Sequence, residues 1–184
     1  MRGWRGAALA LGLGLGGIVG CAGAADSGGA DRGCAPEPFI AFTRDFEDLR
    51  AWPQLALDGP TNAAHASGGA LYASVLGLDA DGGLCAGSAL VREQPANAAG
   101  PASLHGMVKR GGGFNAEGAV GWEWFGFGES ADGEPVVLWR GDEAPSEVGY
   151  NNGVELIEAD CNGCHQAGAA FDFLMSEEAR ALLR

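Results

Sequence analysis

The chain has 184 residues, with 24 acidic and 11 basic side chains and a formal net charge of −13 at pH 7. This charge argues against nucleic acid as a partner, because phosphates bind to basic surfaces. It permits steering toward a basic redox partner, and it equally helps to keep an exported protein soluble. The length indicates one domain once the terminal segments are removed.

The first twenty residues are predicted to be an export signal. Two arginines in residues 1–5 precede an apolar run, Ala7–Val19, which is too short and too rich in glycine for a membrane span. Cys21 follows a small residue, an order that resembles the lipobox of bacterial lipoproteins. We expect cleavage before Cys21 and lipidation of its thiol; ordinary signal cleavage after Ala22 or Ala24 is the alternative.

Both alternatives export the protein, so the bacterial periplasm is the expected compartment. The lipid on Cys21 would be the only attachment to a membrane, and Ala22 carries no inner-membrane retention signal, which favours the outer membrane. Residues 22–33 are small, polar and rich in glycine, which is typical of a flexible tether. The predicted organisation is a signal peptide over residues 1–20, a tether over residues 21–33 and one folded domain over residues 34–184.

The domain is predicted to start with a helix and to continue with strands. Phe46, Leu49 and Trp52 recur at helical spacing within Thr43–Trp52, and Pro53 ends that helix. Because no long helix separates the strand-like runs that follow, antiparallel pairing is favoured. The five predicted strands are Leu71–Leu78, Ser88–Gln94, Leu104–Arg110, Gly121–Phe127 and Pro135–Arg140.

The fourth of these strands has aromatic side chains on both faces. Trp122 and Trp124 fall on one face, and Phe125 and Phe127 fall on the other. We therefore expect both faces of the sheet to be covered.

The pentapeptide Cys161-Asn162-Gly163-Cys164-His165 is the attachment signature of a c-type haem. Cys161 and Cys164 would form thioether bonds to the porphyrin, and His165 would be the proximal ligand of the iron. Export agrees with this interpretation, because bacterial c-type haem attachment takes place outside the cytoplasm.

A Cys-x-x-Cys pair also occurs in redox disulfides and in zinc sites. For zinc, the chain offers only His65 and His105 as further histidines, and neither has a paired spacing. For a thioredoxin-like site, the chain lacks the βαβ unit. The histidine directly after the second cysteine favours haem.

Helices are predicted on both sides of the haem motif. Val154–Ala159 leads into it, and Ser176 caps a short last helix that ends at Arg184. The predicted fold class is therefore α+β, a mostly antiparallel sheet with flanking helices and a mono-haem motif on a C-terminal helix.

Two cysteines remain after the haem and the lipid are assigned, Cys34 and Cys85. An oxidising compartment favours their pairing, so we predict a disulfide between them.

The haem motif lies near the end of the chain, whereas electron-transfer cytochromes c carry it near the start and supply a methionine ligand downstream. Met175 is too close to His165 to reach the opposite face of a haem. A sixth ligand of the iron, if there is one, would come from the strands, as His105, Met107 or Lys109. The helical cytochromes c′ share the C-terminal motif, but they are four-helix bundles, which this glycine-rich chain does not match.

The order of these features resembles the cytochrome P-460 family and its relatives, the beta-type cytochromes c′. The similarity runs from Leu71 onward, with a weaker match at Phe46–Trp52. Besides the haem motif, the residues that carry it are Leu71-Tyr72-Ala73, Ser88–Glu93, Met107-Val108-Lys109, Gly121–Phe125 and Phe171-Asp172-Phe173.

This resemblance implies a homodimer built on an antiparallel sheet, with one covalent haem c, a five-coordinate iron and an open distal pocket against the sheet. Members of the family oxidise hydroxylamine or bind nitric oxide and similar small gases. In the hydroxylamine oxidisers a strand lysine is cross-linked to the porphyrin, and Arg92 stands in its place here. An arginine stays protonated and is a poor nucleophile, so the same cross-link is not expected. Lys109 is the only lysine left for a comparable bond.

Arg92 and His105 are the candidate catalytic residues on the distal side of the haem. The guanidinium of Arg92 could hydrogen-bond an iron-bound anion, a peroxide or NO, or it could pair with a propionate or a carboxylate. His105 could be a distal acid–base group or a sixth ligand, or an ordinary core or surface histidine. Phe114, Trp124 and Phe127 are candidates for an apolar lid over the iron.

The sequence therefore predicts an exported c-type mono-haem protein that binds a small ligand such as NO at a five-coordinate iron. Redox turnover of NO, hydroxylamine or peroxide is a further expectation. A six-coordinate electron-transfer cytochrome is the alternative, and a non-haem redox or structural lipoprotein ranks behind both.

Overall fold

The computed structural model describes residues 34–57, 69–96, 102–145, 149–151, 156–158 and 160–184. The expected signal peptide, the lipidation site Cys21, the tether and His65 lie outside these residues. No helix in the described part of the chain is long and apolar enough to cross a membrane.

Six strands form one antiparallel sheet in which each strand pairs with its neighbours in the chain. The last five strands are the five that the sequence predicts. The mostly antiparallel α+β fold is therefore confirmed. The strands are β1 (Gln54–Ala56), β2 (Ala70–Ser74), β3 (Ala89–Gln94), β4 (Ser103–Lys109), β5 (Trp122–Glu129) and β6 (Pro135–Gly141).

The predicted first helix is wrong in type, since Thr43–Trp52 forms two 3₁₀ helices, η1 (Thr43–Phe46) and η2 (Leu49–Ala51). The backbone of Trp52 is extended, as expected for a residue that precedes a proline, and this ends the helical stretch. β1, which the sequence did not predict, follows directly and adds a short edge strand to the sheet.

The predicted helix before the haem motif is also wrong where it is described. Leu156–Glu158 forms strand β8, which pairs antiparallel with β7 (Gly149–Asn151). A six-residue run is too short to be a stable helix by itself, so the ladder of hydrogen bonds to a neighbouring strand decides its structure.

The C-terminal end contains α1 (Cys161–His165), η3 (Gln166–Phe171), α2 (Glu177–Arg180) and η4 (Ala181–Leu183). The predicted cap of the last helix is confirmed, because Ser176 Oγ accepts a hydrogen bond from Ala179 N at 3.0 Å. The helix itself is shorter than expected and ends in a 3₁₀ turn.

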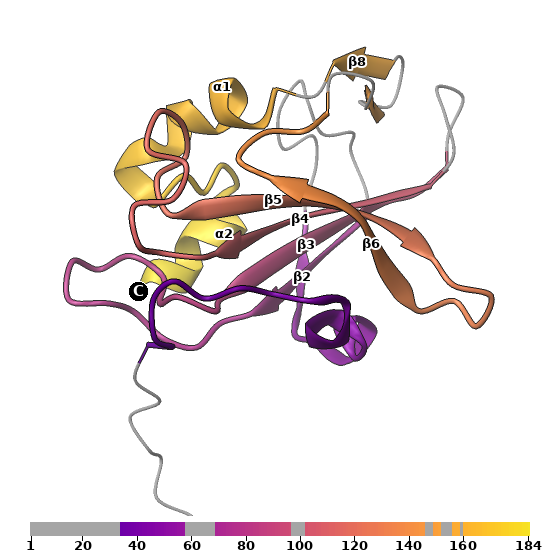
Figure 1. Cartoon of the computed structure of the whole chain (residues 1–184), viewed down its shortest axis with the longest axis horizontal. Coiled ribbons are helices and arrows are strands. Elements are labelled where there is room, and N and C mark those ends of the chain that lie inside the picture. Colours follow the sequence, from indigo (N-terminus) through magenta and orange to yellow (C-terminus); the bar gives the residue numbers. More distant parts are fainter. Residues whose placement is uncertain (1–33, 58–68, 97–101, 146–148, 152–155, 159) are drawn as a thin grey trace, which may run out of the picture. The chain divides into compact units, whose positions relative to one another are not determined.

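Each face of the sheet has its own apolar core, as the aromatic pattern of β5 predicts. Trp122 and Trp124 pack with Cys161 and Leu174 of the C-terminal segment. The other core cluster is formed by the following residues: Ala41, Phe46, Leu49, Ala70, Tyr72, Ala89, Val91, Leu104, Val108, Phe125 and Phe127. Figure 1 shows the C-terminal helices on one side of the sheet and the N-terminal 3₁₀ helices on the other.

The structure contains the disulfide that the sequence predicts, between Cys34 and Cys85. It joins the start of the domain to the loop between β2 and β3. An isolated bridge between Leu78 and Leu84 closes the tight turn in this loop.

Candidate functional site

The haem-motif residues form the single turn α1, and two carboxylates hold its first backbone N–H groups. Asp160 Oδ1 accepts from Gly163 N at 2.7 Å. Glu143 accepts through Oε1 from Cys161 N at 2.7 Å and through Oε2 from Asn162 N at 3.1 Å. These bonds satisfy donors that a helix start leaves without partners, so a turn too short to be stable alone keeps its shape.

His165 is the last residue of α1, and its ring is held in one tautomer. Its Nδ1 lies 2.7 Å from the carbonyl oxygen of Phe173. Because a carbonyl only accepts hydrogen bonds, Nδ1 must carry the proton, and Nε2 of the neutral ring keeps its lone pair. Burial lowers the pKa of His165, which favours this neutral form. The ring packs edge-on against Trp124, with centroids 4.7 Å apart.

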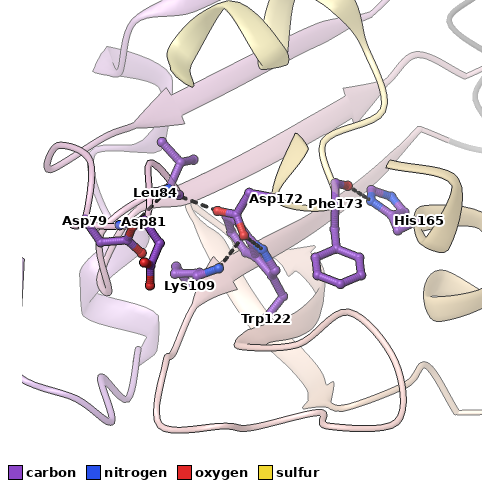
Figure 2. Close-up of polar contacts among 9 residues, drawn as sticks. Asp79, Asp81, Leu84, Lys109, Trp122, His165, Asp172 and Phe173 are labelled. Carbon is purple, nitrogen blue, oxygen red and sulfur yellow. Dashed lines mark hydrogen bonds and ion pairs between the residues drawn. The ribbon is translucent and has the colours of Figure 1, made fainter. Parts of the chain in front are cut away.

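The backbone after η3 is fixed from the sheet through Asp172. The carboxylate of Asp172 accepts from Leu84 N at 2.8 Å and from Trp122 Nε1 at 3.2 Å, and it forms an ion pair with Lys109 Nζ. Figure 2 shows these contacts beside the bond between Phe173 and His165. The sheet thus supports the loop that holds the histidine.

A pocket beside His165 opens onto the face of the sheet that carries Trp122 and Trp124. It contains about 620 Å³ of empty space, including open solvent at its mouth. Arg92, His105 and His165 all line it, so the structure brings together the three residues that the sequence singled out. The remaining lining residues are Leu57, Leu71, Leu90, Gly106, Met107, Trp124, Leu174, Met175, Ser176 and Ala179.

Arg92 of β3 and His105 of β4 lie directly opposite each other in the sheet register. Directly opposite residues of an antiparallel pair share one face, so both belong to the pocket side. Arg92 is 8% exposed, and burial lowers the pKa of its guanidinium. Burial also lowers the pKa of His105 to about 4, which leaves its imidazole neutral at pH 7.

Trp139 of β6 completes this polar row. Its indole lies over Gly126 of β5, where any larger side chain would overlap it. The indole and the ring of His105 are 6.4 Å apart between centroids. A guanidinium, an imidazole and an indole therefore follow one another across the sheet, and the first two of them line the pocket.

Several predicted site residues lie elsewhere. Lys109 is in the ion pair with Asp172 and does not line the pocket. Phe127 is not a lid residue, because it packs in the core cluster on the other face of the sheet. Phe114 lies under the guanidinium of Arg110, 4.3 Å from it, and does not line the pocket either. Of the three proposed lid residues, only Trp124 contributes to the pocket wall.

The residues present fit a covalently attached haem. Cys161, Cys164 and His165 are spaced three and four residues apart on one helical turn, which places them on a common side. With the proton of its ring on Nδ1, Nε2 is the nitrogen of His165 that carries the lone pair an iron would bind. Among the described residues, no cluster of three or more His, Cys, Asp or Glu side chains is arranged to hold a bare metal ion.

The two motif cysteines differ in their surroundings. Cys161 is buried in the core and Cys164 is exposed, and neither belongs to the pocket wall. The pKa of the Cys164 thiol is raised by partial burial and by the negative charges of Asp160 and Glu143. Neither cysteine is in a disulfide, so both keep the thiol group that covalent attachment requires.

Glu143 and Asn162 were not predicted as parts of the site. Glu143 follows β6 in the chain and contacts the motif only in the folded protein, so no local sequence pattern identifies it.

Comparisons of this chain with protein-family models, with curated proteins and with solved structures find no match.

Proposed function

We propose that this chain is an exported, lipid-anchored c-type mono-haem protein that binds a small ligand such as NO at a five-coordinate iron. The haem c would be attached through Cys161 and Cys164, with His165 as proximal ligand and Cys21 as the lipidated residue. A homodimer of the cytochrome P-460 kind in the bacterial periplasm, on the outer membrane, is part of this proposal. A basic redox partner would suit the net charge of −13.

The observation that carries the proposal is the hydrogen bond between His165 Nδ1 and the carbonyl of Phe173, at 2.7 Å. Histidines that bind metals through Nε2 almost always donate their other ring N–H to a carboxylate, a carbonyl or water. A structural histidine in an apolar core has no need of an adjoining pocket, and this one lines a pocket with Arg92 and His105.

A bound haem would supply an iron with one open position for a ligand. The chain supplies the surroundings of that ligand. Leu71, Leu90 and Leu174 line an apolar pocket that limits access of water. Arg92 has donors for a partly negative ligand atom, and the neutral ring of His105 can accept or return one proton. These two groups would support turnover of nitrogen oxides, hydroxylamine or peroxide.

The test is the absorption spectrum of the protein purified from an exporting bacterial host with haem-attachment machinery. We expect a high-spin ferrous spectrum that changes on addition of NO or CO, and an intact mass that includes one haem and the lipid. A chain of unmodified mass would overturn the haem proposal. In His165→Gly, the porphyrin should stay attached while the spectrum changes, since the thioethers remain and the proximal ligand is lost.

A six-coordinate electron-transfer cytochrome is the second candidate. It is favoured by His105 and Met107, because both line the pocket and both are ligands that haem iron accepts. Such a protein would have a low-spin spectrum that NO and CO leave unchanged. Replacing the sixth ligand, as His105→Gln or Met107→Leu, would then convert it to a high-spin form.

A further inference from the structure

The loop after η3 has backbone dihedral angles that its residues do not favour by themselves. Asp172 and Phe173 are consecutive non-glycine residues with φ of 51° and 63°, in the left-handed region. Such conformations are rare for these residue types and persist only where the surroundings impose them. Phe173 N also donates to Gly168 O at 2.9 Å, so the chain turns back toward η3.

The surroundings that impose this turn belong to the sheet and to the loop between β2 and β3. Asp172 receives donors from three separate places: the backbone at Leu84, Lys109 of β4 and Trp122 of β5. The side chains of Lys109 and Asp172 are only 12% and 9% exposed. Solvent therefore screens this ion pair much less than a pair at the surface.

The turn has one consequence for the proximal side of the pocket. With Asp172 fixed, the next residue presents its carbonyl to His165 Nδ1 at 2.7 Å, as Figure 2 shows. A stronger acceptor at Nδ1 makes an imidazole a stronger donor to a metal through Nε2. The contacts from Lys109 through Asp172 to Phe173 therefore act on Nδ1 of His165. Through the ring they also affect Nε2, the nitrogen that would bind iron.

We propose that Lys109 and Asp172 are positioning residues that set the donor strength of His165 by holding the carbonyl of Phe173 against its ring. This rests on the proposed haem function. It also gives the only lysine of the chain a role other than a cross-link to porphyrin.

The test compares Lys109→Met and Asp172→Asn in the haem-loaded protein, by midpoint potential and by the iron–histidine stretching frequency. Loss of positioning weakens the hydrogen bond at Nδ1, so both variants should raise the potential and lower the frequency. A direct charge effect gives opposite shifts, since one variant removes a positive charge and the other a negative one. Opposite shifts, or no shift, would overturn the proposal.

Two controls accompany these variants. Lys109→Arg keeps the charge and should stay close to the wild-type values. Glu129→Gln removes an exposed ion pair with Arg50, 2.6 Å long, and should change neither quantity. A shift of equal size in Glu129→Gln would show that any lost ion pair has this effect, which would also count against the proposal.

A readout without haem separates this inference from the proposed function. In the full chain produced without haem, the ¹⁵N shifts of His165 report its tautomer. We expect the Nδ1–H form in the wild type and a larger Nε2–H fraction in Lys109→Met and Asp172→Asn. Identical tautomers in all three would contradict the positioning role, whether or not the protein takes up haem.

Discussion

The indole Nε1 of Trp124 donates a hydrogen bond to Asn162 Oδ1 at 3.0 Å, which ties the middle of the haem motif to β5. The same oxygen accepts from Ala119 N at 3.0 Å and from Asn115 Nδ2 at 2.8 Å. Trp124 is 3% exposed, so water cannot easily replace this acceptor. Asn162 therefore anchors the motif to the sheet.

Replacing this anchor, as Asn162→Ala, should lower the free energy of unfolding by about 2–3 kcal/mol, because a buried donor is left without an acceptor. Denaturant unfolding of the haem-free chain measures the change. Gln166→Ala, an exposed position directly after the motif, is the matched control and should change stability by less than about 0.5 kcal/mol. Equal losses in the two variants would mean that Asn162 has no special role.

Gly126 leaves room for the indole of Trp139 beside His105. In Gly126→Ala the new methyl group would overlap that indole, so Trp139 has to move away from β5. We expect a loss of about 1–3 kcal/mol in stability and a red shift of tryptophan emission as Trp139 is displaced.

Gly128→Ala is the control for this substitution, because it lies on the same strand. Its methyl group would meet only the end of the Leu138 side chain, which is 69% exposed and can turn away. Its stability should stay near that of the wild type. If Gly128→Ala cost as much as Gly126→Ala, strand propensity rather than contact with Trp139 would explain both results.

The central sheet was predictable because its strands alternate apolar side chains and end at turn residues. The same alternation places Trp122 and Trp124 opposite Phe125 and Phe127, and this was confirmed. β1 has only three residues and no pattern of its own. Leu156–Glu158 has a helix-like composition, but its pairing with β7 depends on residues that meet only in the fold.

The sequence pointed to residues that line the candidate site, but not to the residues that hold them in place. The motif points to His165 and the family resemblance points to Arg92 and His105, and all three line the pocket. The contact between His165 and Phe173 depends on a left-handed turn at two residues that normally avoid it, so no local rule predicts it. Glu143 lies 18 residues before Cys161, so the Cys-x-x-Cys-His pattern itself gives no sign that this carboxylate contacts it.

The disulfide between Cys34 and Cys85 closes a long loop, with a sequence separation of 51 residues. Replacing both cysteines by serine should cost about 4 kcal/mol, because the unfolded chain regains the freedom that the crosslink removes. Thermal unfolding with and without a reductant measures this. Reductant should lower the melting temperature of the wild type to that of the double variant and leave the double variant unchanged. Free thiols at both positions in the exported protein would contradict the pairing.

His105 should make stability depend on pH. Burial lowers its pKa to about 4 in the folded chain, against an ordinary value near 6.5. As the pH falls below about 6.5, the unfolded chain binds a proton that the folded chain does not, so stability falls until about pH 4. The full contribution is on the order of 3 kcal/mol.

Denaturant unfolding of the wild type and of His105→Gln between pH 7.5 and about pH 4.5 isolates this contribution, because His165 and the carboxylates titrate in both proteins and cancel in the difference. The wild type should lose stability relative to His105→Gln across this range, with most of the change below about pH 6.5. A difference that stays constant with pH would show that His105 titrates normally in the folded chain. The imidazole would then be charged at mildly acid pH and could not serve the pocket as a proton acceptor there.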